Sequence, residues 1–254
     1  MIFEKGGVHM DQEVFARVEK KYLVSRAQAK AMTDALRMRS FYMLDFGDPA
    51  VQSLYYDTSD FLLIRLSMER PNYKEKLRLR AYAQPDLNSR SYVEIKKKYQ
   101  GVVYKRRVQL PLGQSVQGLE MGKMPPTCGQ IGREIDRCMA FYQLQPKCVI
   151  RYDRDAWTSD RDLDVRITFD SNIRCRFDHL DLTYRQEGHL IVPEDKLIME
   201  VKTPGVYPLW LVRLLDTIEA KRIHFSKYGT AYTQHIFKGA QQAPEHTKEA
   251  YSIA

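Results

Sequence analysis

The sequence predicts an α+β protein in which amphipathic helices cover one face of a β-sheet. Two observations support this prediction. Many segments alternate with a period of two between charged residues and apolar or β-branched residues, which is typical of strands with one buried face. Other segments repeat apolar residues at the spacing of a helix that packs on a surface. The helices therefore need an apolar sheet face to cover.

The strand predicted for 73–82 shows the alternation most clearly. One face is cationic, and the opposite face carries mostly apolar residues: Lys74, Lys76, Arg78 and Arg80 against Glu75, Leu77, Leu79 and Ala81. Neighbouring cations repel one another unless water screens them or an anion lies between them. The pattern fits either a solvated edge strand, where lysine is common, or a binding site for a polyanion.

The N-terminal part predicts a strand over 15–24, because Glu19 and Lys21 alternate with Val18 and Tyr22. Ser25 and Gln28 have the spacing of a capping box, which predicts a helix to about residue 38. Alternation and the turn at 48–49 predict a strand and a helical turn before the cationic strand, at 51–57 and 61–66.

Gln100-Gly101 predicts a hairpin between strands 91–98 and 102–110. Gly and Pro punctuate 111–126, which we expect to be an irregular connection. Thr127 and Gln130 predict a capped helix up to about residue 142, whose apolar spacing indicates core packing.

In the C-terminal part, alternation predicts strands at 148–157, 163–170 and 196–203, and Ser171-Asn172 predicts a turn into a further strand at 173–177. Pro208 fits the first position of a helix over 208–220. A last helix is expected over 226–237. We expect a loose leader over 1–12, one domain over 13–238 and a disordered tail over 239–254.

Composition narrows the class of protein. The chain has 254 residues, a formal net charge of +8 and a hydrophobic fraction of 44%. The positive net charge favours anionic partners. The four cysteines form no CxxC pair, which argues against a zinc site or a disulfide framework and favours a reducing, cytoplasmic compartment. No apolar run is long enough to span a membrane.

The charged strand faces allow two geometries. Either all of them point to solvent, or a closed sheet carries them into a wet lumen while helices cover the apolar outside. The need of the helices for an apolar surface favours the lumen. A lumen rich in Lys and Arg suits a triphosphate or a longer phosphate chain. Sparse carboxylates among the cations suit Mg²⁺ or Mn²⁺.

Ordered motifs over about 15–237 resemble the VTC (vacuolar transporter chaperone) domain of the triphosphate tunnel metalloenzymes. They are Arg17-Val-Glu19-Lys-Lys21-Tyr, Lys76-Leu-Arg78-Leu-Arg80, Val93-Glu94-Ile-Lys96, Tyr152-Asp-Arg154, Val165-Arg166, Met199-Glu200-Val-Lys202 and Phe225-Ser226-Lys227-Tyr. The resemblance implies a closed eight-stranded antiparallel barrel with helices outside. It also implies synthesis of polyphosphate from ATP or another nucleoside triphosphate.

The resemblance implies three groups of site residues. The residues implied to bind substrate phosphates and to act in catalysis are Lys21, Arg78, Arg80, Lys96, Arg154 and Arg166. The residues implied to make further contacts to the phosphate chain are Lys76, Tyr152, Lys202, Ser226 and Lys227. The residues implied to bind a divalent metal, Mn²⁺ or Mg²⁺, are Glu200, Glu94 and Glu19. Arg17 departs from the ExExK signature of related triphosphatases, which have Glu at this position, and this favours the VTC branch.

The implied reaction moves the nucleotide γ-phosphoryl group onto the end of a polyphosphate chain. The attacking phosphate oxygen is already ionised, so no general base is needed. Two alternatives remain: a triphosphatase, and a non-catalytic module that binds polyphosphate or inositol phosphates. Nucleic acid is disfavoured as a partner because carboxylates lie among the cations. A membrane partner protein is compatible with the sequence. Removing one lumen cation relieves repulsion, so Arg78→Ala or Arg80→Ala is expected to abolish turnover and leave the fold and its stability intact.

Overall fold

The computed structural model describes residues 13–14, 18–69, 71–100, 102–162 and 165–237. The predicted leader, the predicted tail and Arg17 lie outside these residues. Two compact units make up the described chain. The first unit contains 13–14, Gln52–Val149 and Phe177–Arg185; the second contains 18–51, Ile150–Arg176 and 186–237. Both units are therefore assembled from separated stretches of sequence.

The first unit contains an antiparallel sheet with the strand order β1-β7-β6-β5-β4. Its strands are β1 (Glu13–Val14), β4 (Ala50–Asp57, which starts in the second unit), β5 (Tyr73–Tyr82), β6 (Arg90–Tyr99) and β7 (Val102–Pro111). The predicted hairpin is confirmed, because Tyr99 pairs with Val102 across the turn. This turn fixes the register of β6 and β7.

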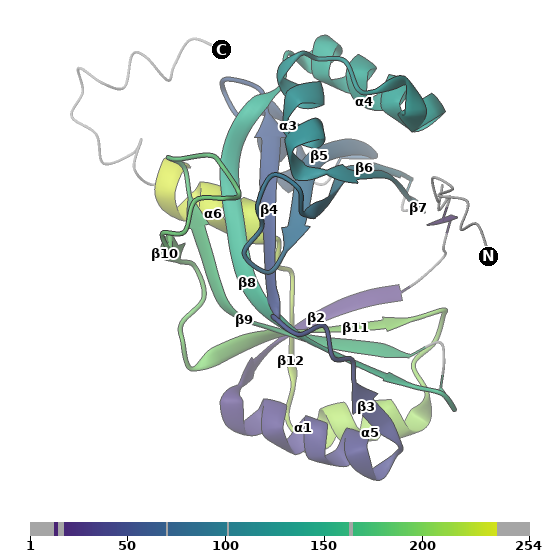
Figure 1. Cartoon of the computed structure of the whole chain (residues 1–254). Coiled ribbons are helices and arrows are strands. Elements are labelled where there is room, and N and C mark those ends of the chain that lie inside the picture. The colour runs from purple at the N-terminus through teal and green to yellow at the C-terminus, as the bar shows by residue number, and fades with distance from the viewer. Residues whose placement is uncertain (1–12, 15–17, 70, 101, 163–164, 238–254) are drawn as a thin grey trace, which may run out of the picture. The chain divides into compact units, whose positions relative to one another are not determined.

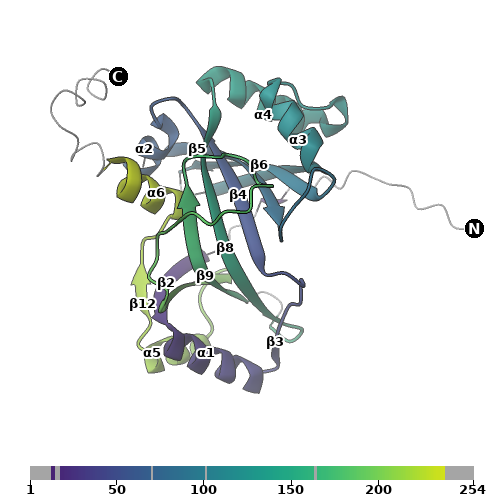
Figure 2. The ribbon, with the colours of Figure 1, turned by 60° about the vertical axis from the view of Figure 1, so that its left-hand side comes forward.

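Helices cover the apolar face of the first sheet, where Leu77, Leu79, Val93 and Ile95 are fully buried. α3 (Leu112–Glu120) packs on β6 and β7 and α4 (Gly129–Tyr142) on β7 (Figure 1), and α2 (Leu62–Met68) packs on β5 (Figure 2). The helices of this unit thus find the apolar surface that their amphipathic patterns require. A short 3-10 helix (Pro126–Cys128) precedes α4.

The second unit contains an antiparallel sheet with the order β8-β9-β11-β2-β12, with β10 beside β9 and β3 beside β8. Its strands are β2 (Val18–Ser25), β3 (Phe41–Met43), β8 (Gln145–Ser159, which starts in the first unit), β9 (Arg166–Arg176), β10 (His189–Leu190), β11 (Lys196–Thr203) and β12 (Lys221–Ile223). The expected alternation of β11 is confirmed, because Leu197, Met199 and Val201 face the core.

The core of the second unit lies under α1 (Arg26–Met38) and α5 (Leu209–Thr217), which pack together on one face of the sheet (Figure 1 and Figure 2). The predicted capping box opens α1: the Ser25 hydroxyl accepts from the Gln28 backbone N–H at 3.1 Å, and the Gln28 side-chain Oε1 accepts from the Ser25 backbone N–H at 2.8 Å. α6 (Lys227–Tyr232) and a π-helical turn (Thr233–Phe237) complete the unit.

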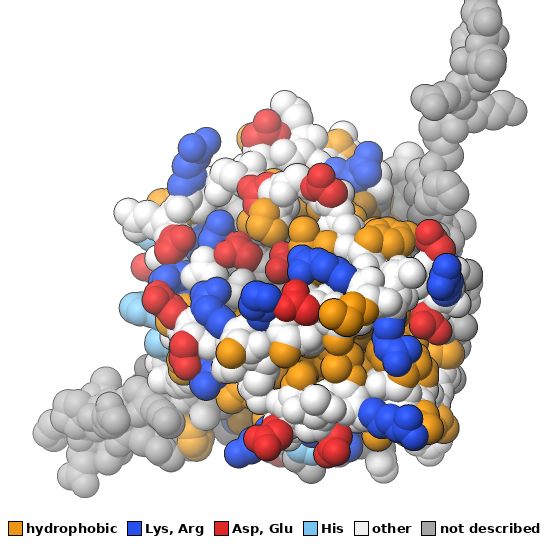
Figure 3. Space-filling view, turned by 90° about the horizontal axis from the view of Figure 1, so that it is seen from below, with side chains coloured by type: hydrophobic (Ala, Val, Ile, Leu, Met, Phe, Trp, Pro, Cys, Tyr) orange, Lys and Arg blue, Asp and Glu red, His pale blue; other side chains and the backbone are white. Residues whose placement is uncertain are grey.

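The outward surface of this helical layer carries both signs of charge. On α1, Asp34 pairs with Lys30 at 2.5 Å and with Arg37 at 3.1 Å. Figure 3, which views the molecule from the side of α1 and α5, shows basic and acidic side chains interspersed with exposed apolar ones. Such mixed surfaces are ordinary for solvated helices and give no sign of a polyanion site.

One prediction of connectivity is wrong. Residues 112–120, expected to be irregular, form α3 after Pro111, with Leu112 and Leu119 buried in the core. The glycines that suggested a loop instead allow close packing. A Cβ at Gly113 would lie 3.3 Å from the Leu87 carbonyl oxygen, and one at Gly118 would lie 3.0 Å from the Met124 sulfur.

Two other local predictions are wrong. The predicted turn at Ser171-Asn172 does not end the strand, because β9 continues to Arg176 with Asn172 in a left-handed conformation at φ +49°. Thr127 does not cap α4, which begins at Gly129 with no side-chain cap among the described residues.

The α+β architecture with antiparallel strands and packed helices is confirmed. Within the described residues, the hydrogen-bonded strand order starts at β1 in the first unit and ends at β12 in the second, and these two strands do not pair with each other. Hydrogen bonds between strands therefore do not form a closed barrel, and the eight-stranded closed barrel stays a prediction. Each unit presents one apolar face to its helices and one charged face on the opposite side, which is the arrangement that the alternation predicts.

Candidate functional site

The strand register of the first unit gathers cations on one face. Directly opposed residues share a face, and the opposed pairs include Lys74 with Lys98, Lys76 with Lys96, and Lys96 with Lys105. Arg78 lies opposite Glu94, which lies opposite Arg107. We call this set the cationic face: Lys74, Lys76, Arg78, Arg80, Glu94, Lys96, Lys98, Lys105 and Arg107.

Glu94 is a buried carboxylate within the cationic face, with 3% of its surface exposed. It accepts from the Arg78 Nε at 2.6 Å and contacts the Lys105 Nζ at 2.8 Å. Burial raises the pKa of Glu94, but Arg78, Arg80 and Lys105 lower it more, so its pKa lies well below the usual range. Glu94 is therefore ionised at neutral pH and neutralises part of the cationic face.

β4 supplies hydroxyl groups to the same face. The Ser53 hydroxyl accepts from the Arg80 Nε at 3.2 Å, and the Tyr55 hydroxyl accepts from the Arg78 Nη1 at 3.3 Å. Arg80 is buried, with 8% of its surface exposed. These bonds restrict the guanidinium groups of both arginines, which are predicted to bind phosphate.

The register of the second unit gathers charges of both signs on one face. Lys202 lies opposite Glu19 on one side and Arg166 on the other, and Glu200 lies opposite Lys21. The Lys202 Nζ lies 2.6 Å from Glu200 and 3.9 Å from Glu19. Together with contacts described next, we call this set the mixed-charge face: Glu19, Lys21, Arg154, Arg166, Asp170, Glu200, Lys202 and Lys227.

Lys21 lies between the two glutamates of this face. Its Nζ lies 3.3 Å from Glu19 and donates to the Phe225 carbonyl at 3.2 Å. Burial lowers the pKa of Lys21, but Glu200 and Glu19 raise it more, so its pKa lies above the ordinary value. Burial raises the pKa of Glu200, while Lys202, Lys21 and Arg154 lower it well below its usual range. Both side chains are charged at neutral pH.

Asp170 organises the other half of the mixed-charge face. It is fully buried and accepts from the Arg154 Nε at 2.6 Å and Nη2 at 2.7 Å, a bidentate pair. Lys227 forms a second ion pair with Asp170. The Lys227 Nζ also lies 4.3 Å from the ring centroid of Tyr152. Burial raises the pKa of Asp170, but Lys227 and Arg154 lower it more, to below its ordinary value.

The structure places every predicted site residue on one of these two faces or at its edge. Ser226 lies at the start of α6, where its hydroxyl accepts from the Gly229 N–H at 3.2 Å and caps the helix. Lys96 and Arg166 are exposed, and Tyr152 is buried. Site roles for these residues stay predictions, because the structure shows where they lie and not what they bind.

The predicted metal ligands divide between the units. Glu200 and Glu19 share Lys202 in the second unit, whereas Glu94 contacts Arg78 and Lys105 in the first. No cluster of three His, Cys, Asp or Glu side chains able to bind a metal occurs in the part of the chain that the structure describes. Two carboxylates still fit Mg²⁺ or Mn²⁺, which is often held by one or two carboxylates plus substrate phosphates.

Sequence reasoning missed several residues of the two faces. Lys105 and Arg107 were not predicted to belong to the site, although the Gln100-Gly101 turn already implies that Lys96 opposes Lys105. Asp170 lies in a strand that the alternation predicts, but the sequence does not show that Asp170 pairs with Arg154 and Lys227. Tyr55 and Ser53 gave no signal, because a hydroxyl that orients an arginine leaves no pattern in one sequence.

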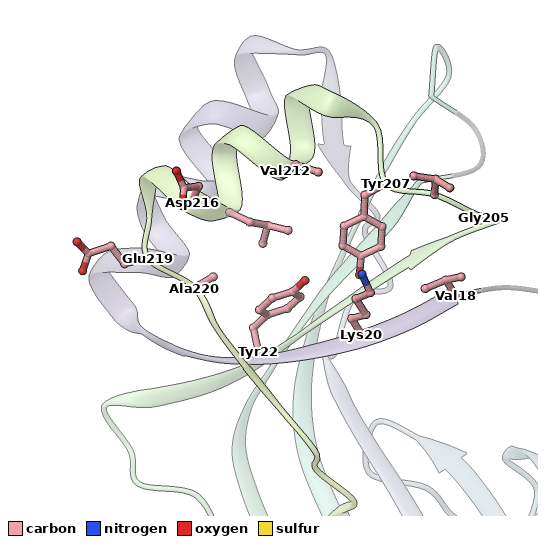
Figure 4. A pocket seen from close by; sticks show the side chains of 11 residues that line it. Val18, Lys20, Tyr22, Gly205, Tyr207, Val212, Asp216, Glu219 and Ala220 are labelled. Atoms are coloured by element: carbon pink, nitrogen blue, oxygen red, sulfur yellow. The ribbon is translucent and has the colours of Figure 1, made fainter. Parts of the chain in front are cut away.

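A separate cavity of about 820 Å³ lies on the helical side of the second unit. Figure 4 shows Lys20 and Tyr22 pointing from β2 toward α5, with Tyr207 beside them. The Lys20 Nζ lies 4.4 Å from the ring centroid of Tyr207. No residue of the mixed-charge face lines this cavity. The cavity therefore lies apart from the candidate site.

Comparison with protein families then identifies the chain. The model of the VTC domain matches residues 16–236. The chain belongs to the VTC domain family. The match contains every predicted site residue, so the cationic face and the mixed-charge face are both parts of the VTC domain. No curated protein matches the chain.

Solved structures share the fold of this VTC domain at low sequence identity. A candidate adenylate cyclase from Bacillus halodurans is 15% identical with a TM-score of 0.52, over 84% of this chain and 94% of that protein. HpAC1 from Hippeastrum, a candidate adenylyl cyclase described as having a dominant triphosphatase activity, is 14% identical with a TM-score of 0.51, over 90% of this chain and 98% of that protein. At this identity the likeness concerns the fold alone.

Two further sequence predictions can be compared with the structure. The cysteines Cys128, Cys138, Cys148 and Cys175 are all buried and form no disulfide among the described residues. No helix in the described part of the chain has the length and apolar character needed to cross a membrane.

Proposed function

We propose that this VTC domain is a metal-dependent phosphotransferase that moves the γ-phosphoryl group of ATP or another nucleoside triphosphate onto a growing polyphosphate chain. The observation that supports it most is the run of directly opposed lysines on the cationic face, Lys76 with Lys96 and Lys96 with Lys105. Like charges directly opposite each other destabilise a sheet. A ligand with regularly repeated negative charge removes this cost.

The chemistry of the face suits such a ligand. Arginine binds phosphate oxygens in bidentate fashion, and lysine supplies a compact positive charge. Arg78 and Arg80 lie beside the lysines and are oriented by β4. The closed barrel, which would surround the phosphate chain with such groups, is part of this proposal and not of the observed fold.

The residues of this chain act by position and charge. Cations beside the transferred group offset negative charge that builds up on its oxygens, and they align donor and acceptor. The terminal oxygen of a phosphate chain is ionised at neutral pH, so the attacking group needs no general base. Asp170 fixes Arg154 and Lys227, two further groups proposed to contact phosphate.

Glu200 and Glu19 are the residues that would hold the divalent metal. When bound, the metal neutralises phosphate charge and adds oxygen-ligand sites for the substrate. Glu94 is less suited to this role, because cations lie close to both of its oxygens, Arg78 at 2.6 Å and Lys105 at 2.8 Å, whereas the close contact of Glu200, to Lys202 at 2.6 Å, involves one oxygen.

Incubation of the protein with ATP and Mn²⁺, followed by sizing of the phosphate products on a gel, tests the proposal. Long phosphate chains are expected. Orthophosphate alone would instead identify a triphosphatase, in which water replaces the phosphate acceptor. Tight binding of polyphosphate without turnover, unchanged by Glu200→Ala, would identify a binding module.

A further inference from the structure

We propose that Tyr55 is a positioning residue that orients the guanidinium of Arg78 for anion binding, and that the cationic face loses affinity for phosphate anions when the Tyr55 hydroxyl loses its proton. The inference rests on the proposed function for the kind of anion. It does not require that the bound anion is turned over.

The geometry is a matched pair of contacts between two strands. On β4, Ser53 and Tyr55 are two residues apart and share a face; on β5, Arg78 and Arg80 do the same. Ser53 binds Arg80 at 3.2 Å, and Tyr55 binds Arg78 at 3.3 Å. Arg78 and Arg80 therefore each contact a hydroxyl of the neighbouring strand.

Tyr55 and Glu94 orient Arg78 from two directions. Glu94 accepts from the Nε at 2.6 Å, and Tyr55 accepts from the Nη1 at 3.3 Å. A planar guanidinium fixed at two of its nitrogens keeps a defined plane, which favours bidentate contact with a phosphate. Both partners of Arg78 are buried.

Only one of the two hydroxyls can ionise in the neutral range. Burial raises the pKa of Tyr55, but the charges of Arg78, Arg80 and Lys76 and the hydrogen bond from Arg78 lower it more, to about 8. A serine hydroxyl does not ionise in this range. Two further charged groups on these strands are Glu94, which pairs with Arg78, and Asp57 on β4, which accepts from the N–H groups of α2.

The direction of the effect follows from charge. A phenolate at Tyr55 neutralises positive charge that would otherwise attract a phosphate, so the affinity for the anion falls as the pH rises through about 8. By linkage, a bound phosphate anion opposes the phenolate and raises the pKa of Tyr55. Below this range the neutral phenol still accepts from Arg78 and orients it.

The experiment measures tripolyphosphate binding by calorimetry between about pH 6.5 and pH 9.5 for the wild-type protein, Tyr55→Phe and Ser53→Ala. The charge of the anion changes with pH in the same way for all three proteins, so the comparison isolates the protein. Wild type and Ser53→Ala are expected to lose affinity with the same slope, up to about tenfold per pH unit above pH 8. Tyr55→Phe is expected to bind more weakly at pH 7 and to lack this slope.

An equal slope in Tyr55→Phe and wild type would overturn the inference. A second measurement follows the Tyr55 ring carbon by NMR with ¹³Cζ-labelled tyrosine, the signal being assigned as the one missing from Tyr55→Phe. It is expected to titrate near pH 8 and to shift to higher pH with tripolyphosphate. A signal that does not titrate by pH 10 would also overturn the inference.

The results separate this inference from the proposed function. A pH slope that depends on Tyr55, without turnover of ATP, refutes the transferase and supports the positioning role. Polyphosphate synthesis with no Tyr55-dependent slope supports the transferase and refutes the positioning role. Absence of tripolyphosphate binding to the wild type contradicts both.

Discussion

The two charged faces are built alike but balanced differently. Each belongs to an antiparallel sheet whose other face is covered by helices. On the cationic face, the Glu94 carboxylate is surrounded by Lys and Arg side chains, and lysines oppose lysines. On the mixed-charge face, Glu19, Glu200 and Asp170 each contact Lys or Arg residues of the same unit.

The difference indicates a division of work. Ion pairs within the mixed-charge face neutralise much of its charge, and its glutamates could bind a metal cation. The cationic face keeps an excess of positive charge, and a bound polyanion is the most direct way to offset it. We therefore propose that the phosphate chain binds chiefly to the cationic face and the metal to the mixed-charge face. The following predictions test this assignment.

The largest effect is expected from the arginines of the cationic face. Arg80→Ala should lower turnover about 100- to 1000-fold, since one preorganised charge is removed from the transferred group. The control is Lys30→Ala, which removes a cation from the exposed surface of α1. Turnover with ATP and Mn²⁺ is the readout. Equal losses in both variants would refute a specific role of the cationic face.

A second difference concerns the glutamates. Glu200→Gln should raise the Mn²⁺ concentration needed for half-maximal turnover at least about tenfold, because a metal ligand is lost. Glu94→Gln should leave the Mn²⁺ dependence unchanged, whatever its effect on the maximal rate. Turnover measured against Mn²⁺ concentration distinguishes them. A rise in the required Mn²⁺ concentration for Glu94→Gln, with none for Glu200→Gln, would instead indicate that Glu94 in the first unit binds the metal.

Stability should respond in opposite ways within the cationic face. Arg78→Ala removes a partner of the buried Glu94 and should lower the free energy of unfolding by about 1–3 kcal/mol. This replaces the expectation from the sequence that removing Arg78 leaves stability intact. Lys98→Ala removes a cation directly opposite Lys74 and should leave stability unchanged or raise it by about 0.5 kcal/mol. Urea unfolding of both variants measures this; a loss in Lys98→Ala as large as in Arg78→Ala would contradict it.

The smallest effect concerns acid. Because the folded-state pKa of Glu94 lies below its ordinary value of 4.5, its ion pairs stabilise the fold above about pH 4.5 and this contribution is lost as the pH falls further. Glu94→Gln should therefore lose about 1–2 kcal/mol less than wild type between pH 5 and pH 3. Thermal unfolding against pH is the measurement. Parallel curves for both proteins would argue against the Glu94 ion pairs.

Alternation in the sequence predicts much of the fold and the composition of both faces. It places Lys76, Arg78 and Arg80 together, and a two-residue turn sets Lys96 against Lys105, because a strand has a strict period of two. The capping box of α1 is predicted for a similar reason, since its bonds are local. The VTC resemblance, which joins these motifs, is confirmed by the family match.

Contacts between distant segments could not be predicted. Asp170 and Lys227 are 57 residues apart, and nothing local to either shows that they pair. Helix α3 was missed because Gly113 and Gly118 resemble loop residues, whereas they allow close contact with Leu87 and Met124. The role of β4 was missed because the partners of Ser53 and Tyr55 lie on another strand.

The most direct test of the central assignment is calorimetric binding of tripolyphosphate, without nucleotide or metal, to the wild type, Lys96→Ala and Lys30→Ala. The account predicts that Lys96→Ala binds at least about tenfold more weakly, and that Lys30→Ala binds like the wild type. Equal affinity in all three proteins would contradict the assignment of the phosphate chain to the cationic face.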